Sequence, residues 1–155
     1  MKMNGSMRQL LDSMSLSLPF VLADESSESL PEMVTIDGSI LLADEYERSR
    51  SVSFKDFPDR TGYECFVNHV HVEDYLDDAG LGSNAILKQG IALANKIVEK
   101  LLPLFPDKLF KVIVAANESG CSVRFHMIRS GENWLSDDLD KYGQEAILVL
   151  ETSPI

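Results

Sequence analysis

One stretch of the chain, from about Ser83 to Leu102, constrains the fold more than any other. Its apolar residues recur at the three-and-four spacing of an α-helix, and they form a face wide enough to cover a β-sheet. They are Ile86, Leu87, Ile91, Ala94, Ile97, Val98, Leu101 and Leu102. We expect Pro103 and Pro106 to end this helix, because proline breaks the helical hydrogen-bond ladder. The helix should pack across a sheet with Ile91 and Val98 buried.

Strands are predicted on both sides of this helix. Asp37-Gly38, between the apolar runs Met33–Ile36 and Ser39–Leu42, suits a type I′ turn and predicts a hairpin. A second hairpin is expected around the turn at 117–120, joining residues 109–116 to 121–129. Further strands are expected over residues 51–57, 63–72 and 146–150, the first two joined by the turn at 58–62.

Short helices flank these strands. Met7, Leu10, Leu11 and Met14 lie at helical spacing behind a possible Ser6 cap, and no function is assigned to the first six residues. A second short helix is expected around Ser136–Tyr142, whereas residues 16–23 are expected to be extended and residues 24–32 to form a polar loop.

The grouping of strands and helices favours one fold class. Because they do not alternate strictly, we expect one α+β domain spanning residues 1–155 rather than a doubly wound parallel sheet. Its sheet should be antiparallel or mixed with about five to seven strands, with the main helix packed on one face and short helices beside it.

The charge of the chain limits its partners. It has 14 basic and 25 acidic residues, a net charge of −11 and a sequence pI near 4.6. Such a surface repels nucleic acids and anionic membranes and attracts basic proteins. No apolar run approaches the roughly 18 residues of a membrane span. Cys65 and Cys121, each in an apolar run that resembles a strand, are expected to be buried free thiols, which fits a reducing cytoplasm.

The histidines offer one route to an enzyme. His69 and His71, two residues apart in a predicted strand, would share one face, and His126 or a nearby acid could complete a metal site. Hydrogen bonding within a half-buried sheet explains the same residues. No nucleophilic triad or phosphate-binding loop is recognisable. A small metal-dependent or acid/base enzyme is therefore the second hypothesis, and neither catalysis nor a cofactor is expected.

Acidic clusters and an aromatic anchor point instead to a protein partner. Acids that follow the predicted strand at 63–72, or surround the predicted helix at 136–142, would form the rim of an interface, with an aromatic anchor of the kind that dominates binding hot spots. The candidate residues are Glu73, Asp74, Tyr75, Asp77, Asp78, Trp134, Asp137, Asp138 and Asp140. Solvated loops explain such acidic runs equally well.

The latter half of the chain resembles immunity proteins of contact-dependent inhibition and other polymorphic toxin systems in bacteria. The resemblance rests on the segments at 66–71, 105–106, 122–126 and 131–135, together with the size and acidity of the chain. It implies a cytoplasmic protein that binds a cognate toxin domain, commonly a basic nuclease, and covers its active site. It assigns no binding residue individually.

Overall fold

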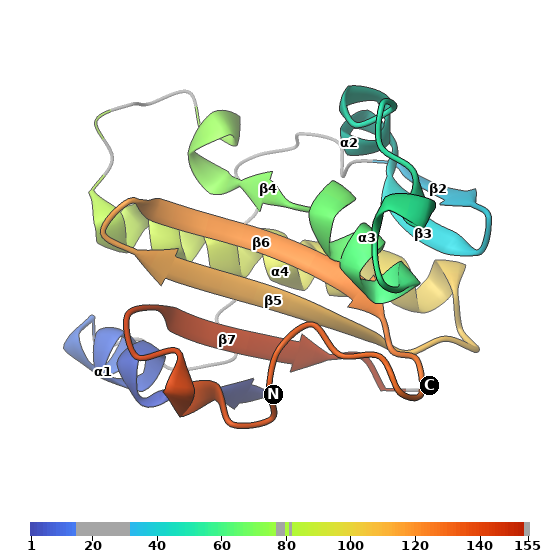
Figure 1. The fold of residues 1–155 in the computed structure, drawn as a ribbon. Coiled ribbons are helices and arrows are strands. Elements are labelled where there is room, and N and C mark those ends of the chain that lie inside the picture. The colour runs from blue at the N-terminus through green and yellow to red at the C-terminus, as the bar shows by residue number, and fades with distance from the viewer. Residues whose placement is uncertain (15–31, 77–79, 81, 154–155) are drawn as a thin grey trace.

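The computed structural model describes residues 1–14, 32–76, 80 and 82–153 of the chain. Within them, five strands form one antiparallel sheet in the order β1-β7-β5-β6-β4, shown in Figure 1. The strands are β1 (Lys2–Met3), β4 (Val70–His71), β5 (Phe110–Asn117), β6 (Gly120–Met127) and β7 (Ala146–Glu151). A separate hairpin pairs β2 (Met33–Ile36) with β3 (Ser39–Leu42). The expected α+β class and antiparallel sheet are confirmed.

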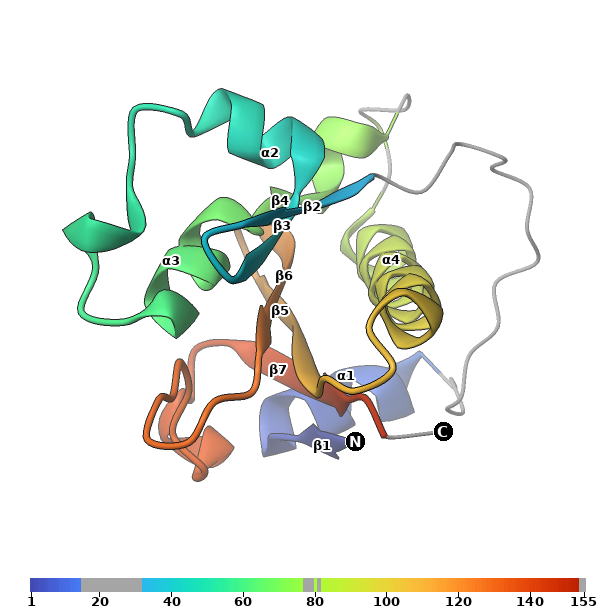
Figure 2. The same cartoon turned by 90° about the vertical axis from the view of Figure 1, so that its right-hand side faces the viewer.

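The helices surround this sheet unequally. The main helix, α4 (Ser83–Leu104), packs across one face, whereas α3 (Arg60–Val67) and the loop after β6 lie on the other side, as Figure 2 shows. The remaining helices are short: α1 (Gly5–Ser13), α2 (Ala43–Arg48) and the 3-10 turns η1 (Phe54–Asp56), η2 (Val72–Tyr75) and η3 (Leu139–Lys141). The expected main helix and flanking helices are therefore present.

The alternation of β6 explains why one face is covered by α4. Cys121, Val123 and Phe125 point into the main core beneath α4, and the residues between them point to the other face. Ile91 is buried as predicted, whereas Val98 is only partly buried and Ile97 takes the central position. The inward-facing rows of β5 and β6 and the apolar face of α4 therefore form this contact together.

Two predicted helix ends need correction. Pro103 does not stop α4, which continues to Leu104, because a proline in the last turn leaves only one carbonyl without its helical partner. Asn4, and not Ser6, caps α1: its side chain accepts a bond from Met7 N at 3.0 Å. Asn4 also accepts from Ile147 N at 3.0 Å, so the first residues are held firmly against β7.

Both predicted hairpins are present. The β2–β3 turn has positive φ at Asp37 (50°) and Gly38 (82°), as a type I′ turn requires. The β5–β6 turn holds Glu118 and Ser119, as expected from the sequence.

The two strands predicted between these hairpins are wrong. Residues 51–57 contain only the turn η1, held by a capping box between Ser53 and Asp56. Residues 63–67 belong to α3, which begins where the Asp59 side chain accepts a bond from Gly62 N, so Cys65 is helical and only Val70–His71 is a strand. In place of the helix predicted at 136–142, the structure has only the short turn η3. The extended segment predicted at 16–23 lies outside the described part of the chain.

Two polar side chains, from α3 and from the residue that caps its C-terminus, join the hairpin to the sheet. Glu64, fully buried, accepts bonds from Ile40 N of β3 at 3.0 Å and from Met127 N of β6 at 2.8 Å. One turn later, Asn68 donates to Ile40 O at 2.9 Å and to Phe125 O at 3.2 Å. These bonds satisfy backbone groups along the edges of both strands, as a neighbouring strand would. A salt bridge from Arg129 to Glu64, 2.7 Å long, balances the buried carboxylate.

Candidate functional site

The three histidines do not form one site. His71 belongs to β4 and His69 lies just before it, with their ring centroids 4.5 Å apart. His126 is four residues beyond Ser122, the β6 partner of His71, and its Nδ1 lies 2.9 Å from Met127 O. Among the described residues, no three His, Cys, Asp or Glu side chains are placed to hold a metal ion. The metal hypothesis therefore lacks its third ligand.

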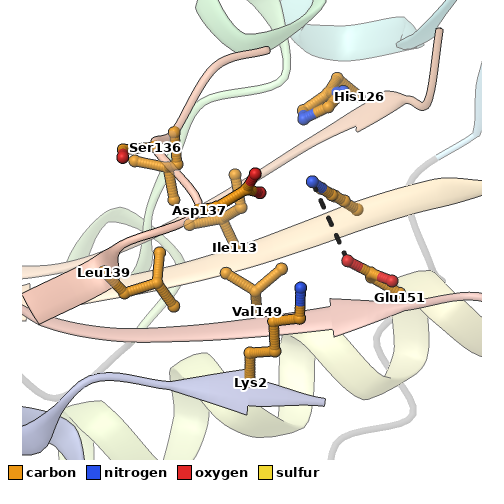
Figure 3. A pocket seen from close by; sticks show the side chains of 10 residues that line it. Lys2, Ile113, His126, Ser136, Asp137, Leu139, Val149 and Glu151 are labelled. Carbon is orange, nitrogen blue, oxygen red and sulfur yellow. Dashed lines mark ion pairs between the residues drawn. The ribbon is translucent and has the colours of Figure 1, made fainter. Parts of the chain in front are cut away.

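A small pocket adjoins His126 on the sheet face opposite α4. Figure 3 shows it between Lys2, Ile113 and Val149 of three strands and Asp137 of the loop after β6. Its volume of about 20 Å³ admits little more than one water molecule. The Lys111–Glu151 ion pair, 3.9 Å long, forms part of its wall. This pocket is too small for an ordinary substrate.

The cysteines offer no nucleophile. Both are buried and free, as predicted. Burial raises the pKa of the Cys65 thiol far above its usual range and that of Cys121 to about 12. Thiols held in the protonated form are poor nucleophiles.

The predicted partner-binding residues fall into two groups. Glu73, Asp74 and Tyr75 lie in η2, directly after β4, which is one edge of the sheet. The second group, Trp134, Asp137, Asp138 and Asp140, belongs to the loop between β6 and β7, on the face opposite α4 (Figure 2). Asp77 and Asp78 lie outside the described residues. The structure thus offers two separate candidate surfaces.

The first group continues onto α2. The Tyr75 hydroxyl donates to Glu45 Oε1 at 2.8 Å, which joins η2 to α2. Burial, followed by this bond to Glu45, raises the pKa of Tyr75 to about 12, yet the side chain remains 40% exposed. We call this region the α2–η2 surface and define it by Asp44, Glu45, Glu47, Glu73, Asp74 and Tyr75.

Sequence analysis missed the α2 half of this surface. The acids of segment 44–47 were not selected as candidate binding residues, but Asp44 and Glu45 lie in the first turn of α2 and Arg48 lies in the last. Acids at a helix start and a base at its end match the helix dipole, and this pattern was the available signal. Arg48 and Arg50 pair with Glu45 and Glu47, at 3.0 and 3.1 Å.

The second group contains a tryptophan in cation–π contact with an arginine. Trp134 is 41% exposed, and Arg124 Cζ of β6 lies 5.0 Å from the centre of its ring. The register of β4 on β6, continued by one residue, puts His69 opposite Arg124 and beside His71. We call this the Arg124 platform and define it by His69, His71, Ser122, Arg124 and Trp134. Sequence analysis named Trp134 as an anchor but not Arg124 as its support.

The loop that carries Trp134 is held at several points. Thr61 of α3 donates to Glu132 Oε2 from both its backbone nitrogen, at 3.1 Å, and its hydroxyl, at 2.7 Å. Asp140 accepts a bond from Gly5 N at 2.7 Å, and Asp138 caps η3. Two of the three predicted loop acids thus have structural bonds, and only Asp137 is exposed without one among the described residues.

The electrostatics of the platform differ from those of the rest of the molecule. Burial, together with the nearby Arg124 charge and His71, lowers the pKa of His69 to about 4. His69 is therefore neutral at pH 7, and Arg124 carries the positive charge of this surface. The α2–η2 surface, by contrast, has more carboxylates than guanidiniums.

Among the described helices, including the 22-residue α4, none has the length and hydropathy needed to cross a bilayer.

Comparison with known proteins identifies a family without a stated activity. The sequence model of the Uncharacterized protein PM0498 family matches residues 2–155. Uncharacterized protein PM0498 of Pasteurella multocida (strain Pm70) is 30% identical over 102 residues, which cover 63% of this chain and 58% of that protein. No solved structure matches the chain. Because the match extends over nearly its whole length, the chain belongs to the Uncharacterized protein PM0498 family.

Proposed function

We propose that this protein binds a basic protein partner through the α2–η2 surface, and that the partner is a toxin domain whose active site it covers in the cytoplasm. The observation that carries the proposal is the Tyr75–Glu45 bond, 2.8 Å long, which holds an exposed aromatic side chain within an acidic surface. An exposed aromatic ring inside a charged rim is the usual composition of a binding hot spot.

Charge makes this surface fit a basic partner. Asp44 and Asp74 are exposed, and neither forms a hydrogen bond or ion pair among the described residues. Their charges are therefore available to a partner, and the net charge of −11 adds a long-range attraction. A nuclease domain, which must hold a polyanion, presents such a basic cleft.

Tyr75 is suited to be the anchor because its position is fixed before binding. The bond to Glu45 and the 3.0 Å pair between Glu45 and Arg48 restrict the ring, so little side-chain entropy is lost on association. Glu73 restrains the same turn by accepting a bond from Cys121 N at 2.7 Å. Glu73 therefore positions the surface, while Asp44 and Asp74 supply its free charge.

The first test is co-expression with the product of the adjacent gene, since an immunity protein is encoded beside its toxin. We expect that product to stop growth when expressed alone, to be tolerated together with this protein, and to co-purify with it at low salt. Equal growth arrest with and without this protein, or no co-purification at low salt, overturns the proposal.

The second test uses charge-matched variants in binding kinetics with the co-purified partner. Asp44→Asn with Asp74→Asn should slow association and flatten its salt dependence, because the long-range electrostatic attraction of the basic partner becomes weaker. Asp12→Asn with Asp107→Asn, two exposed acids on α1 and the α4–β5 loop, removes the same charge and should change association much less. Tyr75→Ala should mainly speed dissociation. Equal effects of the two double variants would remove the α2–η2 surface from the interface.

A further inference from the structure

The Arg124 platform has the wrong charge for the partner proposed above. The α2–η2 surface attracts basic groups, whereas the platform presents a guanidinium beside a tryptophan and two histidines. Its β6 residues, Ser122 and Arg124, alternate with core residues and therefore lie on the face opposite α4. The platform shares no residue with the α2–η2 surface, so variants can test the two sites separately.

Arg124 is only partly satisfied within the protein. Its one hydrogen bond among the described residues runs from Nη1 to Cys65 O at 3.5 Å, at the limit of such a bond. None of the described carboxylates forms an ion pair with it, and it is half-buried. A partly buried guanidinium without a carboxylate is uncommon, because burial normally requires a paired charge.

The tryptophan lies against the guanidinium. Arg124 Cζ is 5.0 Å from the centre of the Trp134 ring. The N–H groups of a guanidinium lie in its own plane, which is the geometry of bidentate carboxylate binding. The exposed part of the Trp134 ring offers apolar contact beside the same position.

We propose that the Arg124 platform binds a carboxylate presented by an acidic protein segment. His69 lies opposite Arg124 in the register, and the His71 ring is tilted against the His69 ring with centroids 4.5 Å apart. His71 and Trp134 are exposed, so a carboxylate carried on a peptide chain can reach the platform from solvent.

The single tryptophan of the chain provides the readout, since Trp134 is part of the platform. The probe is the acetylated and amidated hexapeptide Glu-Phe-Glu-Tyr-Glu-Leu, titrated into the full chain while Trp134 fluorescence and binding heat are recorded. The matched control peptide has Gln at each Glu position. We expect saturable binding of the acidic peptide and none of the control peptide in the same concentration range.

Variants of the protein locate the site. Arg124→Gln should raise the Kd by about tenfold or more, because a charge-assisted bond to the carboxylate is lost. Arg124→Lys should recover only part of the affinity, since lysine keeps the positive charge but lacks the two parallel N–H donors that bind both oxygens of a carboxylate. Lys111→Gln removes a positive charge from the same sheet face, at the Glu151 pair, and should leave the Kd unchanged.

Several results would overturn the proposal: no saturable binding of the acidic peptide, equal binding of the Gln peptide, or equal affinity in Arg124→Gln protein that retains its circular dichroism spectrum. Saturation by inorganic phosphate or a 20-nucleotide single-stranded DNA at the same concentration would assign the platform to phosphates instead. Self-association that Arg124→Gln abolishes would assign it to a second copy of the chain. Failure of the toxin co-expression test leaves this proposal intact, because the two surfaces share no residue.

Discussion

The two faces of the five-stranded sheet differ in the side chains that they carry, and β6 shows this difference residue by residue. Toward α4, its side chains are Cys121, Val123 and Phe125, all buried in one apolar core. Toward the other side, Arg124 meets Trp134 of the loop and Cys65 O of α3, and lies opposite His69 in the register. The α4 side of β6 is therefore apolar, whereas its other side carries polar groups, of which Ser122 and Arg124 are half-buried and His126 is buried.

Substitutions at neighbouring positions of β6 give the largest expected contrast. Phe125→Ala should lower the free energy of unfolding by about 3–5 kcal/mol, because it leaves a cavity beside Phe110. Arg124→Ala should change it by less than about 1 kcal/mol, because the lost contacts are offset by relief of a partly buried charge. Urea denaturation measures both. Similar losses in the free energy of unfolding at the two positions would mean that the two faces contribute equally to stability.

A smaller effect is expected where α4 touches the sheet most closely. A Cβ added at Gly90 would lie 2.6 Å from Cys121 Sγ, so Gly90→Ala should destabilise by about 2 kcal/mol despite the better helix propensity of alanine. The added Cys121→Ala change should recover part of this loss in a double-mutant cycle.

The face of the sheet opposite α4 provides the control for this experiment. Ala115 lies on that face and is half-buried, so Ala115→Val should change stability by less than about 0.5 kcal/mol. Additive effects of Gly90→Ala and Cys121→Ala, with no recovery, would contradict the close contact.

The smallest expected effect is a pH dependence of stability that comes from His69, on the face of the sheet opposite α4. The pKa of His69, about 4 in the folded chain, is lower than its usual 6.5, so the unfolded chain binds more protons between these values. Stability contributed by neutral His69 is present above pH 6.5 and is lost as the pH falls toward 4. Because the side chain is half-buried beside His71 and Arg124, we expect about 1 kcal/mol.

His69→Gln tests this expectation. Thermal unfolding from pH 7 to pH 4 should show a shallower loss of stability in His69→Gln than in the unaltered chain. The His126 pKa is also lowered by burial, so His126→Gln serves as a second, independent comparison. Parallel curves for His69→Gln and the unaltered protein would mean that His69 has an ordinary pKa.

The elements with strong local signals could be predicted from the sequence. The apolar face of α4, the Asp37-Gly38 turn and the alternation of β5 and β6 each specify structure through local spacing. α3 could not be predicted in this way. The run from Tyr63 to Val67 alternates like a strand, but Glu64 is buried by long-range bonds that no local pattern reveals.

The candidate site was only partly predictable for a similar reason. Tyr75 and Trp134 were identified because exposed aromatics near acids are recognisable in a sequence. Their partners, Glu45 and Arg124, come from other segments and are brought to them by the sheet. The sequence also suggested one interface, whereas the sheet puts the two aromatic residues on different surfaces.

The side-chain bridge from α3 has a consequence for how the protein behaves in a crowded solution. An unpaired strand edge is a template on which another chain can add. β4 covers only two residues of β6, and further groups on that edge are bonded by Glu73, Glu64 and Asn68. Glu64 and Asn68 also occupy the edge of β3. Two side chains thus protect two edges at once, so their role extends from holding the fold together to keeping separate molecules apart.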